Sequence, residues 1–200
     1  MSFMYDEQLS MGYEKSNEIL ERLKLKRIDV NGFIHTNAII DAVEDVVNCH
    51  VKVKECSFKS GIGTEYADYG AMMMTHIENG ERVVEIVLNS DKEIEFQRFS
   101  LVHELGHLMT TQNPGDLFQN NEEYVLSTHI NYEITDIPKE VYEHDEFLRG
   151  EQLANIFALR VLMPNKPFFE QLRQRKNLIE VSKVFGLSPT AVISRIMLVE

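Results

Sequence analysis

The stretch FSLVHELGHLMTTQ, residues 99–112, constrains the fold most, because it has the pattern of a helix that is buried on most of its sides. Apolar side chains cover most of the circumference: Phe99, Leu101, Val102, Leu105, Leu108 and Met109. The polar side chains form one stripe: Ser100, His103, Glu104, His107 and Thr111. Polar groups that leave water need new partners, so the fold must bring a ligand or other polar groups against this stripe.

The spacing of the two histidines predicts a metal site. Residues four apart on a helix lie about 40° apart around its axis, so His103 and His107 project from one face. Zinc accepts imidazole nitrogens in tetrahedral geometry, and a catalytic zinc takes three protein ligands and leaves one position for water. Glu104 points near the same face, which suits a general base that acts on this water. The pattern alone is moderately specific, and two ordinary hydrogen-bonded histidines are the alternative.

A third ligand is needed, and Glu151 is the best-placed candidate. Glu151 and Asn155 share a helix face in EQLANIFA, residues 151–158. The carboxylate can bind the metal, while the Asn155 amide hydrogen-bonds the distal nitrogen of a ligating histidine and orients it. Alternatively, Glu151 is a solvated residue that the helix dipole favours at a helix start. Other residues upstream are further possible ligands: His129, His144, Asp145 and Glu146.

The rest of the pattern predicts an α+β fold, with a small mixed or antiparallel sheet packed against the zinc-bearing helices. The chain has 200 residues, 44% of them hydrophobic, which is enough for a core. Strands are expected from about Val51, and residues 71–88 hold two β-rich runs joined by Asn79-Gly80, the favoured pair for a two-residue hairpin turn. An extended substrate could add as a strand to an exposed edge of this hairpin.

Helices are expected at residues 6–25, 37–48, about 93–110, 146–162, and in two short pieces split at FGLSP, residues 185–189. Asn37 is the expected N-cap of the second helix, and the prolines of residues 163–167 end the fourth. Gly186 is expected to stop a helix, and Ser188-Pro189 to cap and begin the next one.

Residues 112–150 form a long acidic region with few regular signals, and such loops are often functional. Attack of metal-activated water on a substrate carbonyl would need a second donor to the oxyanion besides the metal. This region offers five candidates: Tyr124, His129, Tyr132, Tyr142 and His144.

Three ordered motifs carry a family resemblance: RFSLVHELGH at residues 98–107, E-x-x-A-N-x-F-A at 151–158 with LMP at 162–164, and a tail at 184–195 that begins VFGLSP. Together they resemble the ImmA/IrrE family of zinc metallopeptidases over roughly residues 80–197. The resemblance implies a gluzincin-like peptidase in which His103, His107 and Glu151 bind Zn²⁺ and Glu104 is the general base. It also implies a protein substrate such as a helix-turn-helix repressor, in bacterial or mobile-element regulation. The region between His107 and Glu151 is longer than is usual for the family.

On this basis residues 1–167 are expected to form a metallopeptidase-like domain, and residues 168–200 a C-terminal helical segment packed on it. The alternative is a non-catalytic regulatory or DNA-binding protein, in which residues 177–197 act as a helix-turn-helix. Nearby basic residues would support that alternative: Arg173, Arg175, Lys176, Lys183 and Arg195. The series of apolar residues in the same segment instead predicts that its helices pack on the domain.

The net charge of −12 argues against nucleic acid as the main partner, because a phosphate backbone would repel the molecule. Cys49 and Cys56 are expected to be free thiols. No stretch is long and apolar enough for a membrane span, and the N-terminal sequence lacks the pattern of a signal peptide, so we expect a cytoplasmic protein.

Overall fold

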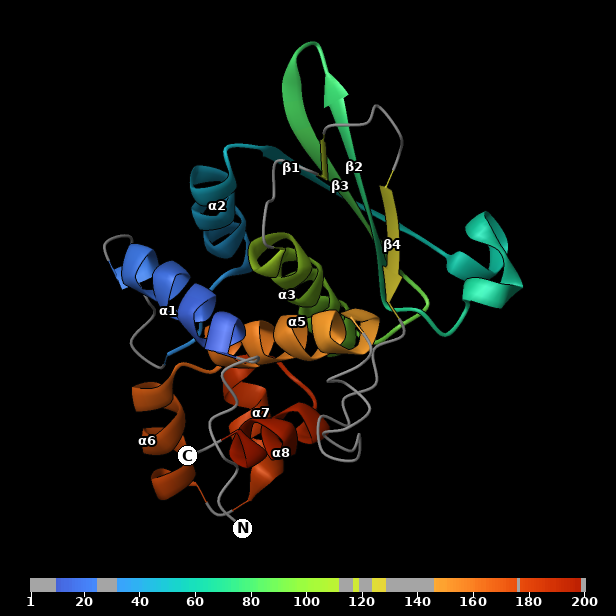
Figure 1. Cartoon of the computed structure of the whole chain (residues 1–200). Helices are drawn as coiled ribbons and strands as arrows, with labels where there is room; N and C mark the ends of the chain where they lie inside the picture. The colour runs from blue at the N-terminus through green and yellow to red at the C-terminus, as the bar shows by residue number, and fades with distance from the viewer. Residues whose placement is uncertain are drawn as a thin grey trace.

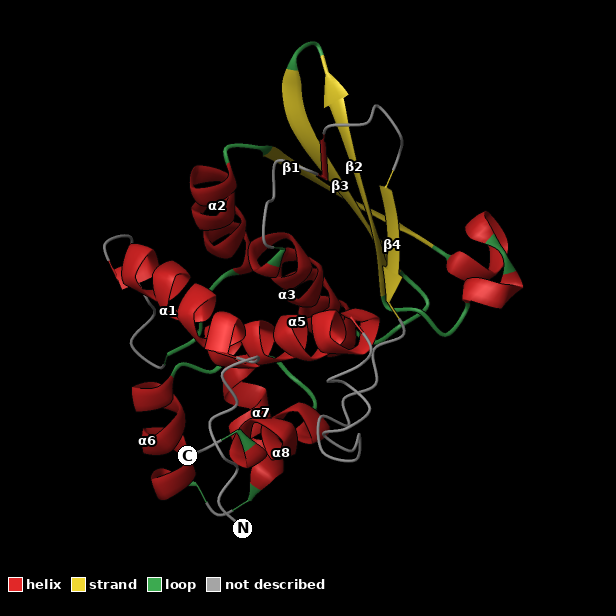
Figure 2. Cartoon of the chain, viewed as in Figure 1, coloured by secondary structure: helices red, strands yellow, loops and turns green. Residues whose placement is uncertain are grey.

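The computed structural model describes residues 10–24, 32–111, 117–118, 124–128, 146–175 and 177–198. Its helices are α1 (Ser10–Lys24), α2 (Thr36–Val47), α3 (Ile94–Thr110), α5 (Glu146–Leu162), α6 (Asn165–Gln174), α7 (Leu178–Phe185) and α8 (Pro189–Met197). Its strands are β1 (His50–Cys56), β2 (Ala71–Glu78), β3 (Glu81–Asn89) and β4 (Tyr124–Thr128). The sheet lies at one end of the molecule, with the α-helices gathered on one side of it, while two short helical turns, η2 (Phe58–Ile62) and η3 (Thr64–Tyr66), lie on the other side (Figures 1 and 2). The predicted α+β class is confirmed.

The four strands form one mixed sheet in the order β1-β3-β2-β4. The β2–β3 hairpin is confirmed, and its turn residues Asn79 and Gly80 have φ angles of 52° and 87°, the left-handed region that such a turn requires. β1 runs parallel to β3, because residues 57–70 cross from one side of β3 to the other at the same end of the sheet, after which β2 runs back antiparallel to β3. β4 pairs antiparallel with β2. The prediction that residues 112–150 are loop-like is therefore wrong for residues 124–128.

Helix α3 is the centre of the core. Every residue from Phe99 to Thr110 is buried, and the helix lies between the sheet and α5 (Figure 1). Two polar residues of its stripe are satisfied within the helix: Ser100 Oγ donates to the Phe96 carbonyl at 2.8 Å, and Thr111 Oγ1 donates to the His107 carbonyl at 2.8 Å. The remaining polar residues of the stripe, the two histidines and Glu104, belong to the site described below.

Helix α5 packs tightly between α1 and α3, and a glycine allows each close approach. A Cβ built on Gly106 of α3 would lie 2.9 Å from the Cα and carbonyl oxygen of Ala154. A Cβ built on Gly12 of α1 would lie 3.0 Å from the Leu153 carbonyl oxygen. The approach at Gly106 fixes the level at which α5 faces the histidines of α3.

The C-terminal helices pack on this core, as the apolar pattern predicted. Val181, Phe185, Ala191 and Val192 are buried in the same hydrophobic cluster as α3 and α5. Gly186 ends α7 in the left-handed conformation, and Ser188 Oγ accepts from the Ala191 N–H at the start of α8, as expected. The division at residue 167 stays a prediction.

Two helix starts differ from the prediction. Helix α2 begins at Thr36 after His35, so Asn37 is inside the first turn and is not the N-cap. Residues 163–167 end α5 as expected, but Asn165 already begins α6, which the sequence pattern did not indicate. The reason is that Pro167 stands in the first turn of α6, where the missing N–H would have no partner in the helix anyway.

Candidate metal centre

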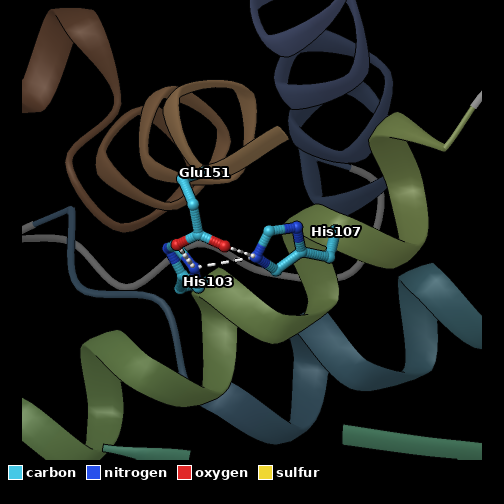
Figure 3. A group of neighbouring side chains, drawn as sticks. All are labelled: His103, His107 and Glu151. Carbon is cyan, nitrogen blue, oxygen red and sulfur yellow. Dashed lines mark hydrogen bonds and ion pairs between the residues drawn. The ribbon is translucent and has the colours of Figure 1, made fainter. Parts of the chain in front are cut away.

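His103, His107 and Glu151 converge on one point between α3 and α5 (Figure 3). The two histidines project from successive turns of α3, and Glu151 reaches toward them from the N-terminal half of α5. Nε2 of His103 lies 3.0 Å from Nε2 of His107. The Glu151 carboxylate closes the triangle, with Oε2 at 3.3 Å from Nε2 of His103 and Oε1 at 3.0 Å from Nε2 of His107.

Asn155, one helical turn after Glu151, orients His103. Its Oδ1 lies 2.8 Å from Nδ1 of His103, and both side chains are buried. An amide oxygen can only accept, so Nδ1 carries the hydrogen and the neutral ring presents a lone pair at Nε2. That lone pair faces His107 and Glu151, which is the arrangement expected for a metal ligand with an oriented distal nitrogen.

A bound cation would satisfy these three side chains better than hydrogen bonds among them can. The site contains a lone pair of His103, a second ring nitrogen and a carboxylate, and it has too few N–H hydrogens to pair all of these acceptors. Glu151 Oε1 is buried, and despite its 3.0 Å approach to His107 it makes no hydrogen bond of normal geometry with any described residue. Ligands about 2.0–2.1 Å from a tetrahedral zinc would lie roughly 3.3 Å apart, close to the observed 3.0–3.3 Å. The side chains present therefore suit a metal ion.

The electrostatics of Glu151 favour the charged carboxylate. Burial raises the pKa of its carboxyl group, but the imidazoles of His103 and His107 beside it lower the pKa more strongly, to about 2. Glu151 is therefore ionised near neutral pH, as a metal ligand must be. Glu104, which follows His103 on α3, is fully buried.

Several predicted residues cannot be compared with this geometry. His129, Tyr132, Tyr142, His144 and Asp145 lie outside the described residues. Tyr124 belongs to β4 and Glu146 begins α5, but their side chains also lie outside the description. Among the described residues, His103, His107 and Glu151 form the group that could hold a metal ion.

The expected open edge of the hairpin is absent from the described sheet. β3 is paired with β1 on its outer side and β2 with β4, so both hairpin strands are interior strands. The hypothesis that a substrate adds to the hairpin is therefore wrong as stated, because a strand can be added only at β1 or β4.

The helix-turn-helix alternative loses one of its basic residues. Arg195 is only 1% exposed; its Nε donates to the Met163 carbonyl at 3.1 Å, and its Nη2 donates to Asn165 Oδ1. Its guanidinium lies over the ring of Phe168. Arg195 therefore ties α8 to the end of α5 and the start of α6, and is not available to a DNA backbone.

An α+β fold whose central buried helix carries His-Glu-x-x-His, with a glutamate from a second helix completing the triad, is that of a metallopeptidase-like domain. Residues 59–197 match the family model Peptidase_M78, described as the IrrE N-terminal-like domain, and the chain belongs to this family. The expected family resemblance is thereby confirmed, and a peptidase family implies a protein substrate. No curated protein matches the chain. No described helix is long and apolar enough to cross a membrane.

Proposed function

We propose that this protein is a zinc-dependent peptidase, with His103, His107 and Glu151 as metal ligands and Glu104 as the general base. One observation supports this most: two helices far apart in the sequence bring two ring nitrogens and one carboxylate within 3.0–3.3 Å of one another, with a lone pair of His103 aimed at the centre. Membership of a peptidase family supports the same reaction class.

In the proposed hydrolysis, the metal ion, Glu104 and Asn155 have separate roles. A zinc ion at this position supplies Lewis-acid chemistry, which activates water and polarises a peptide carbonyl. Glu104 accepts the proton of the attacking water and then donates it to the leaving amine nitrogen. Asn155 keeps His103 in the tautomer that presents Nε2, and the apolar sides of α3 keep bulk water away from the buried groups.

The finer assignments are extensions of this proposal. A helix-turn-helix repressor as substrate, a role in mobile-element regulation and a cytoplasmic location follow from the family resemblance and the composition. The alternative of a non-catalytic regulatory protein predicts the same fold with no turnover, so an activity measurement separates the two.

The test compares the purified protein with Glu104→Gln in cleavage of a fluorogenic peptide library, with metal content measured on both. We expect Glu104→Gln to retain stoichiometric zinc and to lose cleavage by roughly 10²-fold or more, because it cannot take the proton. Glu170→Gln, an exposed glutamate on α6, is the matched control and should cleave normally. Undiminished cleavage by Glu104→Gln would refute the assigned base, and Glu151→Ala with full zinc content would refute the third ligand.

A further inference from the structure

A cavity of about 440 Å³ lies between α2, β1 and the first half of α3. Its apolar lining consists of Phe33, Ile40, Val53, Leu88, Ile94 and Leu101. This volume is within the range of cavities that hold a small molecule or a large side chain. Phe33, Ile40 and Val53 precede residue 59, where the family match begins, so the cavity combines matched and unmatched parts of the chain.

This cavity is separate from the metal centre. At about 100° per residue, Ile94, Arg98 and Leu101 fall within about 60° of one another around α3, and His103 projects from roughly the opposite side. The helix that presents the metal ligands to α5 therefore presents a second, independent surface to the cavity.

Strand β1 gives the cavity an open sheet edge. The Val51 N–H donates to Glu44 Oε1 at 2.6 Å, away from β3, whereas the Cys56 carbonyl accepts from Ser90 N, which follows β3. Backbone groups alternate along a strand, so the N–H and C=O of Val53 and Glu55 point outward, like those of Val51. Within the described sheet, in which β1 is an edge strand, these four groups make no hydrogen bond to another residue.

The side chains at this edge are unusually exposed for apolar residues. Val51, Val53 and Glu55 share the face of β1 that is turned toward the helices, since Val51 is buried and both other residues line the cavity. Val53 is 38% exposed, and Ile94 at the start of α3 is 68% exposed. An edge strand with outward backbone groups and apolar side chains beside a cavity is a template for strand addition.

The charges of the lining select a basic occupant. Glu55 and Glu95 contribute two carboxylates. Arg98 is the one basic residue of the lining, so the two carboxylates outnumber its single positive charge; its Nε donates to the Phe185 carbonyl at 3.1 Å and its Nη2 to the Ile34 carbonyl at 2.6 Å. The buried amide oxygen of Gln97, which also lines the cavity, accepts no hydrogen bond from any described residue. The chain as a whole carries a net charge of −12, which attracts a basic partner over a longer range.

We infer that the β1 edge and this cavity form a docking site for an extended, basic segment of a partner protein. The segment pairs with the outward backbone groups of Val53 and Glu55. On its inward side it places an apolar side chain against Val53 and Ile94, and, two residues away, a lysine or arginine near Glu55 and Glu95. The inference does not depend on the proposed peptidase activity, because no residue of the metal centre takes part.

The test measures fluorescence anisotropy of a short labelled peptide in which leucine and lysine stand two residues apart in a threonine background. The protein is the full chain carrying Glu104→Gln, so that cleavage cannot interfere. We expect saturable binding that weakens with salt and is unchanged after the metal is removed by chelation. Replacing lysine by glutamate in the peptide, or N-methylating its strand-pairing amides, should each weaken binding severalfold.

Variants of the site distinguish specific docking at β1 from non-specific electrostatic binding of a basic peptide to an acidic protein. Ile94→Ser should weaken binding roughly tenfold, whereas Ile179→Ser, on an exposed isoleucine of α7 outside the cavity lining, should leave it unchanged. Glu55→Lys should reverse the preference between the lysine and glutamate peptides, whereas Glu81→Lys, at the exposed start of β3, should not. Absence of binding, equal effects of site and control variants, or full binding of the N-methylated peptide would overturn the inference.

Discussion

The amide oxygen of Asn155 lies 2.8 Å from Nδ1 of His103 and fixes which nitrogen of that ring carries the hydrogen. The contact joins α3 and α5 one helical turn from Glu151, so one helix supplies both a proposed ligand and the group that orients another ligand. This arrangement makes the metal site depend on the register of α5 against α3.

The first prediction concerns this contact. Asn155→Ala should lower metal affinity about 10–100-fold, because His103 loses the acceptor that holds its tautomer and orientation. Asn155→Asp keeps an acceptor at the same place and should retain the metal. The affinities are measured by competition with a chromophoric chelator. Equal losses in both variants would show that Asn155 contributes through packing and not by accepting this hydrogen bond.

The second prediction concerns the approach of α5 to Gly106. Gly106→Ala should destabilise the protein by about 1–3 kcal/mol despite the higher helix propensity of alanine, because its Cβ would lie 2.9 Å from the Ala154 backbone. Gly150→Ala, also within a helix but with nothing within 4 Å of its built Cβ, is the control and should stabilise by up to about 1 kcal/mol. Denaturant unfolding of both variants measures the difference, and a neutral Gly106→Ala would contradict the packing argument.

The triad and its helices could be predicted from the sequence because the patterns that indicate them lie within short stretches of the chain. The i, i+4 spacing of His103 and His107 determines their common face, and the same spacing relates Glu151 to Asn155. The hairpin turn was predictable for a similar reason, since Asn79-Gly80 favours left-handed backbone. The prediction that the two helices form one site rested on the order of the motifs in the family, because no spacing rule relates residues so far apart in the sequence.

The missed features depend on contacts between distant parts of the chain. β4 is a short strand whose partner, β2, is some fifty residues away, so its local pattern carries little signal. The parallel pairing of β1 depends on the path of residues 57–70, which no periodicity reveals. Only the helix-turn-helix alternative places Arg195 on a basic surface, as is usual for arginine, whereas its acceptors in the fold, Met163 and Asn165, lie about thirty residues earlier.

The third prediction concerns Arg195. Arg195→Ala should destabilise the protein by about 2–4 kcal/mol, because it takes the donor away from the carbonyl of the buried Met163, breaks the contact with Asn165 and removes the cover from Phe168. Arg195→Lys should recover only part of the loss, since an ammonium group cannot reach both acceptors as a guanidinium does. Arg173→Ala, at an exposed position on α6, should change stability by less than about 0.5 kcal/mol. Thermal unfolding tests all three, and a mild effect of Arg195→Ala would reopen the possibility of a surface role.

The fourth prediction concerns the two cysteines, which are free as expected. Burial is the main reason why the pKa of the Cys49 thiol rises from 9.0 to about 11, and the negative charge of Glu44 raises it further. A thiol reacts as its thiolate, so at pH 8 Cys49 should be alkylated roughly 100-fold more slowly than an unperturbed thiol. In a Cys56→Ser background the rate should rise about tenfold per pH unit until about pH 11.

The same shift has a consequence for stability, and its sign follows from the direction of the pKa change. The folded protein holds the thiol proton more tightly than the unfolded chain, so the contribution of Cys49 is complete below pH 9.0 and is lost as the pH rises toward 11. Cys49→Ala should therefore reduce the loss of unfolding free energy between pH 9 and 11. Glu44→Gln should remove only part of the increase in the Cys49 pKa, because burial is the larger cause. An alkylation rate that levels off near pH 9 would show that the thiol is solvated, contrary to its half-buried position between α2 and β1.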